Sequence, residues 1–475
     1  MGSNFAPLPA LASLNRIQPD VKIAGAERGG SADEALVAVE VSGKKDATQK
    51  NGKFDTAAYD LRLFRNGQIV GQWPVPKGGM GGAEDIGQWK IESLVPGTEN
   101  EGKATHIFKV KVAARDKGQP VRFTAYAFNE DRVKSETASN DDKVYKVPDD
   151  IAPSKPRAYV ITIGVNDYEN PKWELGFAVK DALDLSGALK SIEGYEVVSV
   201  PLVSGEKDGA KVYEATKQNI ADAFALLGGH EEPKERLRRA LGPIVGQLRK
   251  ATPDDLVIIG FSGHGYANKG GRFYLLPSDS GKENLSEDES KNAAILPKFV
   301  SSDELSQWLK DVDAGELAMI IDACHSAGAV PEGFKPGPMG DRGLGQLAYD
   351  KGMRILAATQ ADNVALESEK LGQGLLTYAL VKEGLNTHKA APDGTGPITI
   401  GAWLRYAEQR VPQLYAAGKV RAIEIVPQKG AAQTLTKDSV VNPALSFRDE
   451  IAQHAQTPQL FDFYKLNNDA VLVAR

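Results

Sequence analysis

From residue 157 onward, the chain alternates almost uninterrupted runs of Val, Ile and Leu with longer stretches of helical periodicity. Such runs are typical of strands buried on both faces, and their alternation with helices is typical of a parallel sheet with crossover helices. The pattern predicts an α/β fold with a mostly parallel central sheet flanked by helices. Expected strands span residues 158–164, 195–201, 256–261, 317–321 and 354–358, and expected helices span residues 178–191, 216–227, 235–250, 302–309, 375–383 and 400–413.

Two of these apolar runs are followed by loops that carry reactive side chains. The third run leads into SGHG, which contains His264, and the fourth leads into DACHSAG, which contains Cys324. The carboxyl ends of parallel strands meet at one edge of a sheet, so a thiol and an imidazole there suit a nucleophile and a base. Taken singly, Cys324 would more often be a small buried apolar residue and His264 a hydrogen-bonded loop histidine. The two motifs together favour a catalytic pair.

The order of the elements, the FSGHG and IDACHSAG motifs and their spacing of 60 residues resemble the caspase-like cysteine peptidases of clan CD, family C14. The resemblance covers about residues 157–415. Caspases carry a glutamine where this chain has Asp322, and the Asp-x-Cys-His-Ser pattern is closer to metacaspases and their bacterial relatives. The resemblance implies that Cys324 is the nucleophile, that His264 is the general base and acid, and that the amides of Gly265 and Cys324 form the oxyanion hole. The alternative base is His325, whose side chain is expected to point away from the adjacent cysteine.

The same resemblance suggests the substrate preference. It places Asp322 at the floor of the S1 pocket, together with Asp181 at the start of the first helix and Ser262 on the pocket wall. Two carboxylates in a pocket favour a guanidinium or ammonium group, because an unpaired buried charge is costly and a bidentate Arg removes that cost. The chain is therefore expected to cleave after Arg or Lys. The alternative for Asp181 is an ordinary carboxylate stabilised by a helix N-terminus.

A Gly- and Pro-rich segment at residues 329–347 follows Cys324 and is expected to be a loop. The resemblance to caspase-like peptidases implies that the chain is cut in this loop during activation, by itself or by another protease. Lys335 precedes a proline, whereas Arg342 precedes a glycine, so cleavage is predicted after Arg342. The charged residues 278–299 are expected to form a mobile surface loop.

The region before residue 149 has a different pattern. Short β-branched or alternating runs at residues 35–41, 59–65, 68–73, 105–112 and 121–129 predict a small β-sandwich of immunoglobulin or fibronectin type. Asn66-Gly67 lies between two of these runs and predicts a hairpin. The expected organisation is an irregular lead (1–33), the β-sandwich (34–148), a linker (149–156), the caspase-like domain (157–430) and a C-terminal tail (431–475).

Composition excludes several classes of protein. The net charge of -6 comes without a Lys/Arg-rich block, so nucleic-acid binding has no electrostatic support. A single cysteine excludes an intrachain disulfide and fits a reducing compartment. No apolar run is long enough to cross a membrane, and the first residues do not resemble a secretion signal, so a cytoplasmic protein without membrane partners is expected.

The sequence and the family resemblance also predict cofactors and partners. The remaining histidines lack metal-ligand spacing, so no metal and no cofactor is expected. Residues 283–289 are acidic and could bind calcium, as in many metacaspases, but a solvated charged loop is the more ordinary reading. The expected partners are protein substrates with Arg or Lys cleavage sites and an upstream activating protease. The chain is expected to be a monomer, as metacaspases usually are.

Two other functions stay open. The caspase-like domain could be an inactive scaffold, or it could be an active protease with acidic P1 specificity. The β-sandwich would recruit substrate or regulate the peptidase. By analogy with multidomain bacterial proteins, the biological role would lie in stress, regulated cell death or antiviral defence.

Overall fold

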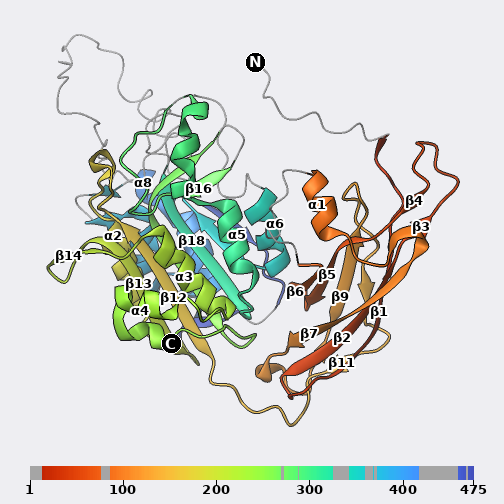
Figure 1. Cartoon of the computed structure of the whole chain (residues 1–475). Coiled ribbons are helices and arrows are strands. Elements are labelled where there is room, and N and C mark those ends of the chain that lie inside the picture. The colour runs from red at the N-terminus through yellow and green to blue at the C-terminus, as the bar shows by residue number, and fades with distance from the viewer. Residues whose placement is uncertain are drawn as a thin grey trace.

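The computed structural model describes residues 13–75, 86–268, 272–286, 288–324, 342–358, 367–368, 372–416, 458–466 and 469–474. The chain has an α/β region, and the β-rich region that precedes it lies to its right in Figure 1. This confirms the predicted fold class, a mostly parallel sheet flanked by helices and preceded by antiparallel strands.

The central sheet of the α/β region runs in the order β14-β13-β12-β15-β18-β19-β23. The five inner strands pair in parallel, and the two edge strands β14 and β23 pair antiparallel to their neighbours. The bounds are β12 (Arg157–Val165), β13 (Glu196–Lys207), β14 (Ala210–Tyr213), β15 (Leu256–Ala267), β18 (Glu316–Cys324), β19 (Arg354–Ala357) and β23 (Gln459–Asp462). All five predicted strands are therefore present.

The third and fourth predicted strands are longer than expected, so the prediction that His264 and Cys324 lie in loops is wrong. β15 continues to Ala267 because its last residues pair with two partners, β18 and the short antiparallel strand β16 (Phe273–Leu275). β16 in turn pairs with β17 (Val300–Ser301). Small residues do not end a strand whose backbone hydrogen bonds are supplied from both sides.

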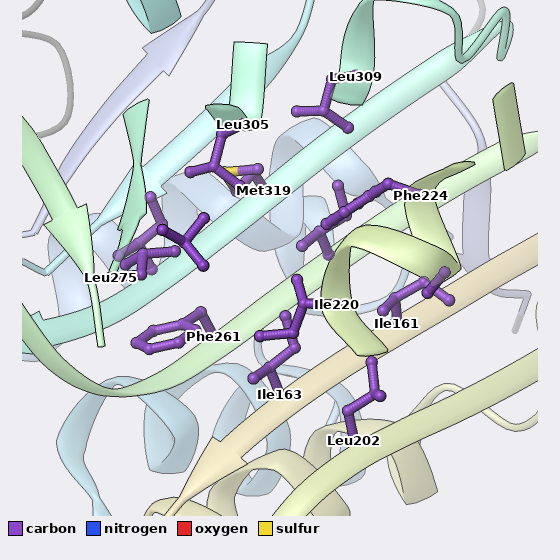
Figure 2. Close-up of a cluster of buried hydrophobic side chains, with 14 of the residues drawn as sticks. Ile161, Ile163, Leu202, Ile220, Phe224, Phe261, Leu275, Leu305, Leu309 and Met319 are labelled. Atoms are coloured by element: carbon purple, nitrogen blue, oxygen red, sulfur yellow. The ribbon is translucent and has the colours of Figure 1, made fainter. Parts of the chain in front are cut away.

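Helices cover both faces of the sheet. One face carries α3 (Lys217–Gly228), α4 (Lys234–Leu241), α5 (Ser302–Lys310) and α6 (Arg342–Lys351), and the other carries α2 (Ala178–Ala188), α7 (Leu375–Thr377) with the π-helical turn Tyr378–Asn386, and α8 (Ile400–Ala416). Figure 2 shows the first core, where Ile220 and Phe224 of α3 and Leu305 of α5 face the sheet residues Ile163 and Met319. The alternation of sheet side chains between the two cores explains the continuous apolar runs.

Two segments predicted as loops contain helices. Residues 278–299 include 3-10 turns at Glu289–Ala294 and Leu296–Lys298, and Ile295 and Phe299 are buried in the core. In the segment 329–347, residues 329–341 lie outside the described residues, while α6 begins at Arg342. Leu344, Leu347 and Ala348 of this helix pack in the same core as α3 and α5. The many glycines and prolines nearby made this apolar pattern hard to recognise in the sequence.

The β-rich region contains two antiparallel sheets, with a shared core between them. One sheet has the order β1-β2-β7, and the other has the order β10-β9-β5-β6. The bounds are β1 (Asp20–Arg28), β2 (Glu34–Ser42), β5 (Tyr59–Arg65), β6 (Gln68–Trp73), β7 (Lys103–Lys111), β9 (Phe123–Phe128) and β10 (Ala138–Ser139), with the smaller pairs β3 (Lys44–Lys45) with β4 (Asp55–Thr56) and β8 (Pro120–Val121) with β11 (Tyr145–Lys146). A helix, α1 (Ile86–Ser93), was not predicted.

The hairpin prediction is confirmed, since Asn66 and Gly67 join β5 to β6 with φ of 50° and 84°. The prediction of an irregular lead over residues 1–33 is wrong for residues 20–28, which form β1. This edge strand has a bulge next to Gly25 and buries only Ile23, so it shows no alternation of apolar and polar residues.

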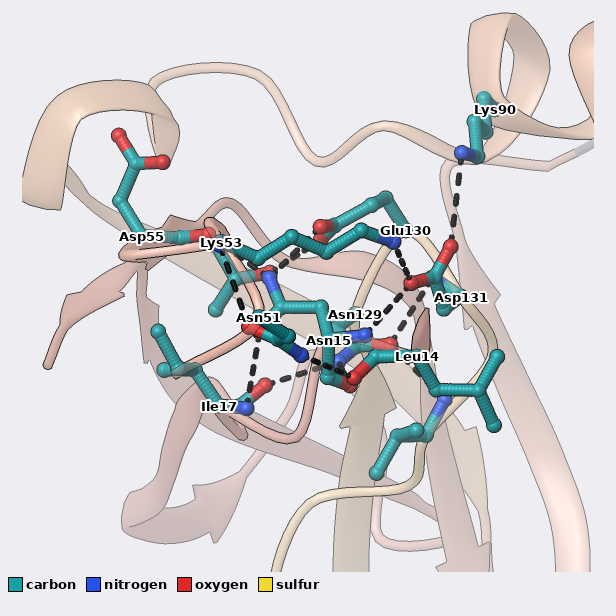
Figure 3. Close-up of polar contacts among 12 residues, drawn as sticks. Leu14, Asn15, Ile17, Asn51, Lys53, Asp55, Lys90, Asn129, Glu130 and Asp131 are labelled. Carbon is teal, nitrogen blue, oxygen red and sulfur yellow. Dashed lines mark hydrogen bonds and ion pairs between the residues drawn. The ribbon is translucent and has the colours of Figure 1, made fainter. Parts of the chain in front are cut away.

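The segment before β1 is also held in place (Figure 3). Asn15 donates its side-chain amide to Glu130 Oε1 at 2.6 Å and to the Asp55 carbonyl at 2.8 Å, and Asp131 accepts from its backbone N–H at 2.7 Å. The Asn129 amide donates back to the carbonyls of Asn15 and Ile17. These bonds attach residues 15–17 to the β-rich region.

The C-terminal residues are part of the fold, which corrects the prediction of a separate tail from residue 431. β23 pairs with β19 at the edge of the central sheet, and β24 (Val471–Val473) pairs with β22 (Ile398–Thr399). The two strands contain only four and three residues, too few for a recognisable periodic pattern in the sequence.

Buried polar contacts join the two regions. Arg62 of β5 is bonded to Asp350 of α6 at 2.7 Å and to Asp60 at 2.7 Å, and all three side chains are buried. Arg65 pairs with Asp313 at 3.0 Å. The residues between the regions, 151–156, contain no helix or strand.

Candidate active site

The two predicted catalytic residues lie side by side in the central sheet. β15 and β18 pair in parallel with His264 opposite Cys324, Gly263 opposite Ala323 and Ser262 opposite Asp322. Cys324 is the last residue of β18, and its side chain lies outside the described residues. The register therefore brings the two motifs together, as the parallel-sheet argument predicted.

His264 is buried and held by two aromatic residues of the loop between β12 and α2. Its Nε2 lies 2.8 Å from the Trp173 carbonyl oxygen, and its backbone N–H donates to the Tyr168 hydroxyl at 2.9 Å. A carbonyl can only accept, so Nε2 carries the proton and Nδ1 of the neutral ring carries the lone pair. Burial lowers the pKa of His264 from 6.5 to about 4, against a smaller opposing effect of the Trp173 carbonyl.

Residues 278–286 hold this loop in position. The Asn170 amide donates to the Glu283 carbonyl at 3.2 Å and to Asn284 Oδ1 at 3.1 Å, and Glu169 N–H donates to the Ser278 carbonyl at 3.0 Å. Asn170 also caps the turn that ends at Trp173. Part of the segment expected to be a mobile loop therefore supports the carbonyl that orients His264.

Two glycines let α2 approach the sheet closely. A Cβ at Gly164 of β12 would lie 2.5 Å from the Ala178 carbonyl oxygen and 2.7 Å from Ala182 Cβ, and one at Gly260 would lie 2.6 Å from a methyl group of Leu185. This close packing places the first turn of α2, with Asp181, beside the ends of the central strands.

The three predicted S1 residues converge at this edge. Asp181, Asp322 and Ser262 are buried, with relative exposures of 4%, 6% and 9%. The Ser262 hydroxyl lies 3.4 Å from Asp181 Oδ2. Gly374 N–H donates to Asp181 Oδ1 at 3.0 Å and to Oδ2 at 3.2 Å, and a Cβ on Gly374 would lie 2.8 Å from Asp181 Oδ2 and 3.1 Å from Asp322 Oδ2. The two carboxylates therefore approach one point from different elements.

Other predicted residues are less defined. Gly265 lies in β15, where a Cβ would meet Phe273 and Ala323 at 3.2–3.3 Å, so close packing by itself accounts for a glycine there. Arg342 is the first residue of α6, and its side chain lies outside the described residues, as do His325 and Lys335. The oxyanion and processing roles stay predictions.

Sequence reasoning missed three residues at this site, which are Tyr168, Trp173 and Gly374. Tyr168 and Trp173 act through a hydroxyl and a backbone carbonyl in an irregular loop, and Gly374 acts through its amide. None of these groups leaves a periodic signal. Within the part of the chain that the structure describes, no group of three or more His, Cys, Asp or Glu could hold a metal ion.

A three-layer α/β fold with a histidine and a cysteine paired near the carboxyl ends of adjacent central strands is the arrangement expected of caspase-like proteins. Residues 157–434, more than half of the chain, match the family model described as Caspase domain, of peptidase family C14. The chain belongs to this family.

Comparisons beyond the family model add little. Two similar solved structures are one described as pro-sf-caspase-1 and one of caspase-1 from Spodoptera frugiperda. Each is 12% identical; they cover 67% and 68% of this chain and 92% and 91% of their own chains, with TM-scores of 0.31 and 0.30. No curated protein sequence matches the chain. Similarity at this level carries no argument about the site.

Proposed function

We propose that this caspase-family protein is a cysteine endopeptidase that cleaves after Arg or Lys. The observation that carries the proposal is the convergence of the Asp181 and Asp322 carboxylates next to the paired strand positions of His264 and Cys324. A cationic side chain would be attracted to both carboxylates at once, whereas an acidic P1 side chain would bring a further carboxylate into a buried acidic site.

The catalytic cycle follows from the protonation of His264. Its Nδ1 accepts the thiol proton of Cys324, and the thiolate attacks the scissile carbonyl. The amides of Gly265 and Cys324 stabilise the oxyanion of the tetrahedral intermediate. The imidazolium then protonates the leaving amine, and water hydrolyses the thioester by the reverse proton transfers. The Trp173 carbonyl holds the ring and stabilises the imidazolium when it forms.

The low pKa of His264 supports a particular resting state. Burial disfavours the imidazolium, so the resting imidazole is neutral and can take up the thiol proton when substrate binds. In this site His264 works as a general base, and a permanent ion pair with the thiolate is not needed.

Activation is proposed to require cleavage after Arg342. Arg342 is the first residue of α6, so the proposed cleavage site lies within the first turn of this helix. Proteases bind extended backbone, so cleavage there needs the first turn of α6 to open.

A panel of fluorogenic peptides with Arg, Lys or Asp at P1 tests these proposals on the parent chain, Cys324→Ala and Arg342→Ala. We expect the parent to cleave the Arg and Lys peptides only, Cys324→Ala to cleave none, and Arg342→Ala to stay uncut and less active. Cleavage of the Asp peptide would favour acidic specificity. A parent chain inactive on all three peptides, before and after trypsin treatment, would favour the scaffold alternative.

The proposal also covers the subfamily, the location, the oligomeric state and the biological role of the protein. We place the chain among the bacterial metacaspases, as a cytoplasmic monomer that needs no cofactor and acts in regulated cell death or antiviral defence. In the described part of the chain, none of the helices has the length and apolar character to cross a bilayer. Sedimentation, and activity with and without EGTA, test the monomer and the calcium dependence.

A further inference from the structure

We propose that Gly374 is a specificity-determining residue of the S1 pocket. Its amide orients the Asp181 carboxylate, and its missing side chain keeps open the point at which the Asp181 and Asp322 carboxylates converge. This inference rests on the proposed function for the identity of the ligand, a guanidinium or ammonium group. Its structural basis is independent of whether the chain cleaves peptides.

The amide of Gly374 holds the Asp181 carboxylate in position. It donates to both carboxylate oxygens, at 3.0 and 3.2 Å, and the Ser262 hydroxyl lies 3.4 Å from Oδ2. Both of these donors act on the carboxylate of Asp181, so its orientation is set by groups from two different strands, β21 and β15. A carboxylate held in this way is pre-oriented for a bidentate partner.

The missing side chain matters because both carboxylates lie close to the same atom. A Cβ at position 374 would be 2.8 Å from Asp181 Oδ2 and 3.1 Å from Asp322 Oδ2. The first distance is shorter than real Cβ contacts, so one of the groups would have to move. A methyl group there would separate the carboxylates and remove one face of each from a cationic ligand.

Gly374 cannot move away easily, because its neighbour is anchored as well. Gly374 and Gln373 form β21, which pairs with β20 (Glu367–Ser368). Gln373 is buried, and its side-chain amide makes a hydrogen bond at each end. The amide nitrogen donates to Asp184 Oδ2 at 3.0 Å, and the amide oxygen accepts from Tyr378 N–H at 3.0 Å. Residues 373 and 374 are thus attached to carboxylates one turn apart on α2.

The backbone of Gly374 makes alanine a clean substitution. Its φ of -65° and ψ of 151° are allowed for any L-residue, so Gly374→Ala introduces no backbone strain. The control is Gly187→Ala, an exposed glycine in the last turn of α2, the helix that carries Asp181, where an added Cβ meets nothing within 4 Å. Any difference between the two variants reports the crowding of the pocket.

The experiment measures kinetics on a P1 Arg peptide for the parent, Gly374→Ala and Gly187→Ala. It also measures benzamidine binding by calorimetry to each chain carrying Cys324→Ala. For Gly374→Ala we expect KM to rise and benzamidine affinity to fall by roughly 10- to 100-fold, the usual effect of losing a charge-assisted hydrogen bond. The rate of alkylation of the single cysteine by iodoacetamide, which needs no S1 pocket, should match that of Gly187→Ala, and the Tm of Gly374→Ala should stay close to that of the parent chain.

The outcomes separate this inference from the proposed function. If Gly374→Ala cleaves and binds like Gly187→Ala, the inference is wrong while the peptidase stands. If the parent cleaves no peptide but binds benzamidine in a way that depends on Gly374, the cation site stands and the peptidase proposal falls. An absence of benzamidine binding to the Cys324→Ala chain, or a large drop in the Tm of Gly374→Ala, overturns the inference.

Discussion

At the scale of single residues, the environment of His264 determines how the candidate site would work. The ring lies 3% exposed between Tyr168, whose ring centroid is 5.1 Å away, and the Trp173 carbonyl. The ring is therefore neutral across the physiological pH range, which is the protonation state that a general base needs. The same burial explains the direction of its pKa shift.

The first prediction concerns the acid side of the pH profile. A base is active only when it is unprotonated, so kcat/KM on a P1 Arg peptide should stay nearly constant from pH 7 to pH 5.5. It should then fall toward a midpoint near the His264 pKa of about 4, below the ordinary 6.5. The measurement is kcat/KM between pH 4 and pH 8. A fall centred on pH 6.5 would mean that His264 is more solvated than it is here.

Stability should change in the same pH range. Between pH 6.5 and 4 the unfolded chain protonates this histidine while the folded chain does not, so His264 makes folding less favourable as the pH falls through this window. A urea titration of the parent and of His264→Gln at pH 7 and pH 5 isolates the contribution, since the variant lacks the group that titrates.

At the scale of elements, the packing of α2 against β12 decides where Asp181 lies. The helix can approach only because Gly164 has no side chain, and the first turn then reaches the carboxyl ends of β15 and β18. If α2 lay farther from β12, Asp181 and Asp322 would be farther apart. The packing of this helix and the substrate specificity of the candidate site are therefore coupled.

The prediction at this scale compares a glycine in a crowded position, Gly164, with one in an open position, Gly187. Gly164→Ala should destabilise the chain by about 1–3 kcal/mol through overpacking and should raise KM for a P1 Arg peptide. Gly187→Ala should instead stabilise it by up to about 1 kcal/mol, because alanine is the better helix former and the position is open. Urea unfolding and peptide kinetics measure both. Equal effects of the two substitutions would contradict the packing argument.

At the scale of the whole molecule, the β-rich region is built into the peptidase region. β5 buries both of its faces, with Leu61 and Leu63 in the sandwich core and Arg62 against α6. α6 begins at Arg342, where the chain returns from the segment after Cys324. The β-rich region therefore holds the helix next to the candidate cleavage site, which favours a regulatory role over simple substrate recruitment.

The prediction for this interface is a loss of stability on Arg62→Met. The change would leave Asp60 and the fully buried Asp350 without their cation, and breaking a buried ion pair costs about 3–5 kcal/mol. Arg28→Met is the control, because its pair with Asp150 is exposed and should contribute less than about 1 kcal/mol. Urea unfolding followed by fluorescence measures both. Similar midpoints for the two variants would show that Arg62 does not couple the regions.

Much of this organisation could be predicted from the sequence, because the information was local. The continuous apolar runs predicted the five parallel strands, and the position of His264 and Cys324 just after two of these runs predicted that they would meet. The Asn66-Gly67 pair predicted its hairpin, since both residues adopt positive φ. Strand β1, helix α6 and strands β23 and β24 were missed because their patterns are short, bulged or set among glycines and prolines.

The sequence by itself determined the fold class, the family and the set of candidate side chains, since these depend on periodicity and on motifs read along the chain. Only the tertiary structure decided that the Trp173 carbonyl orients His264, that Gly374 lies between Asp181 and Asp322, and that Arg62 reaches Asp350. The physical reason is that a hydrogen bond or a close contact depends on two segments at once. Periodicity records only whether each segment is buried.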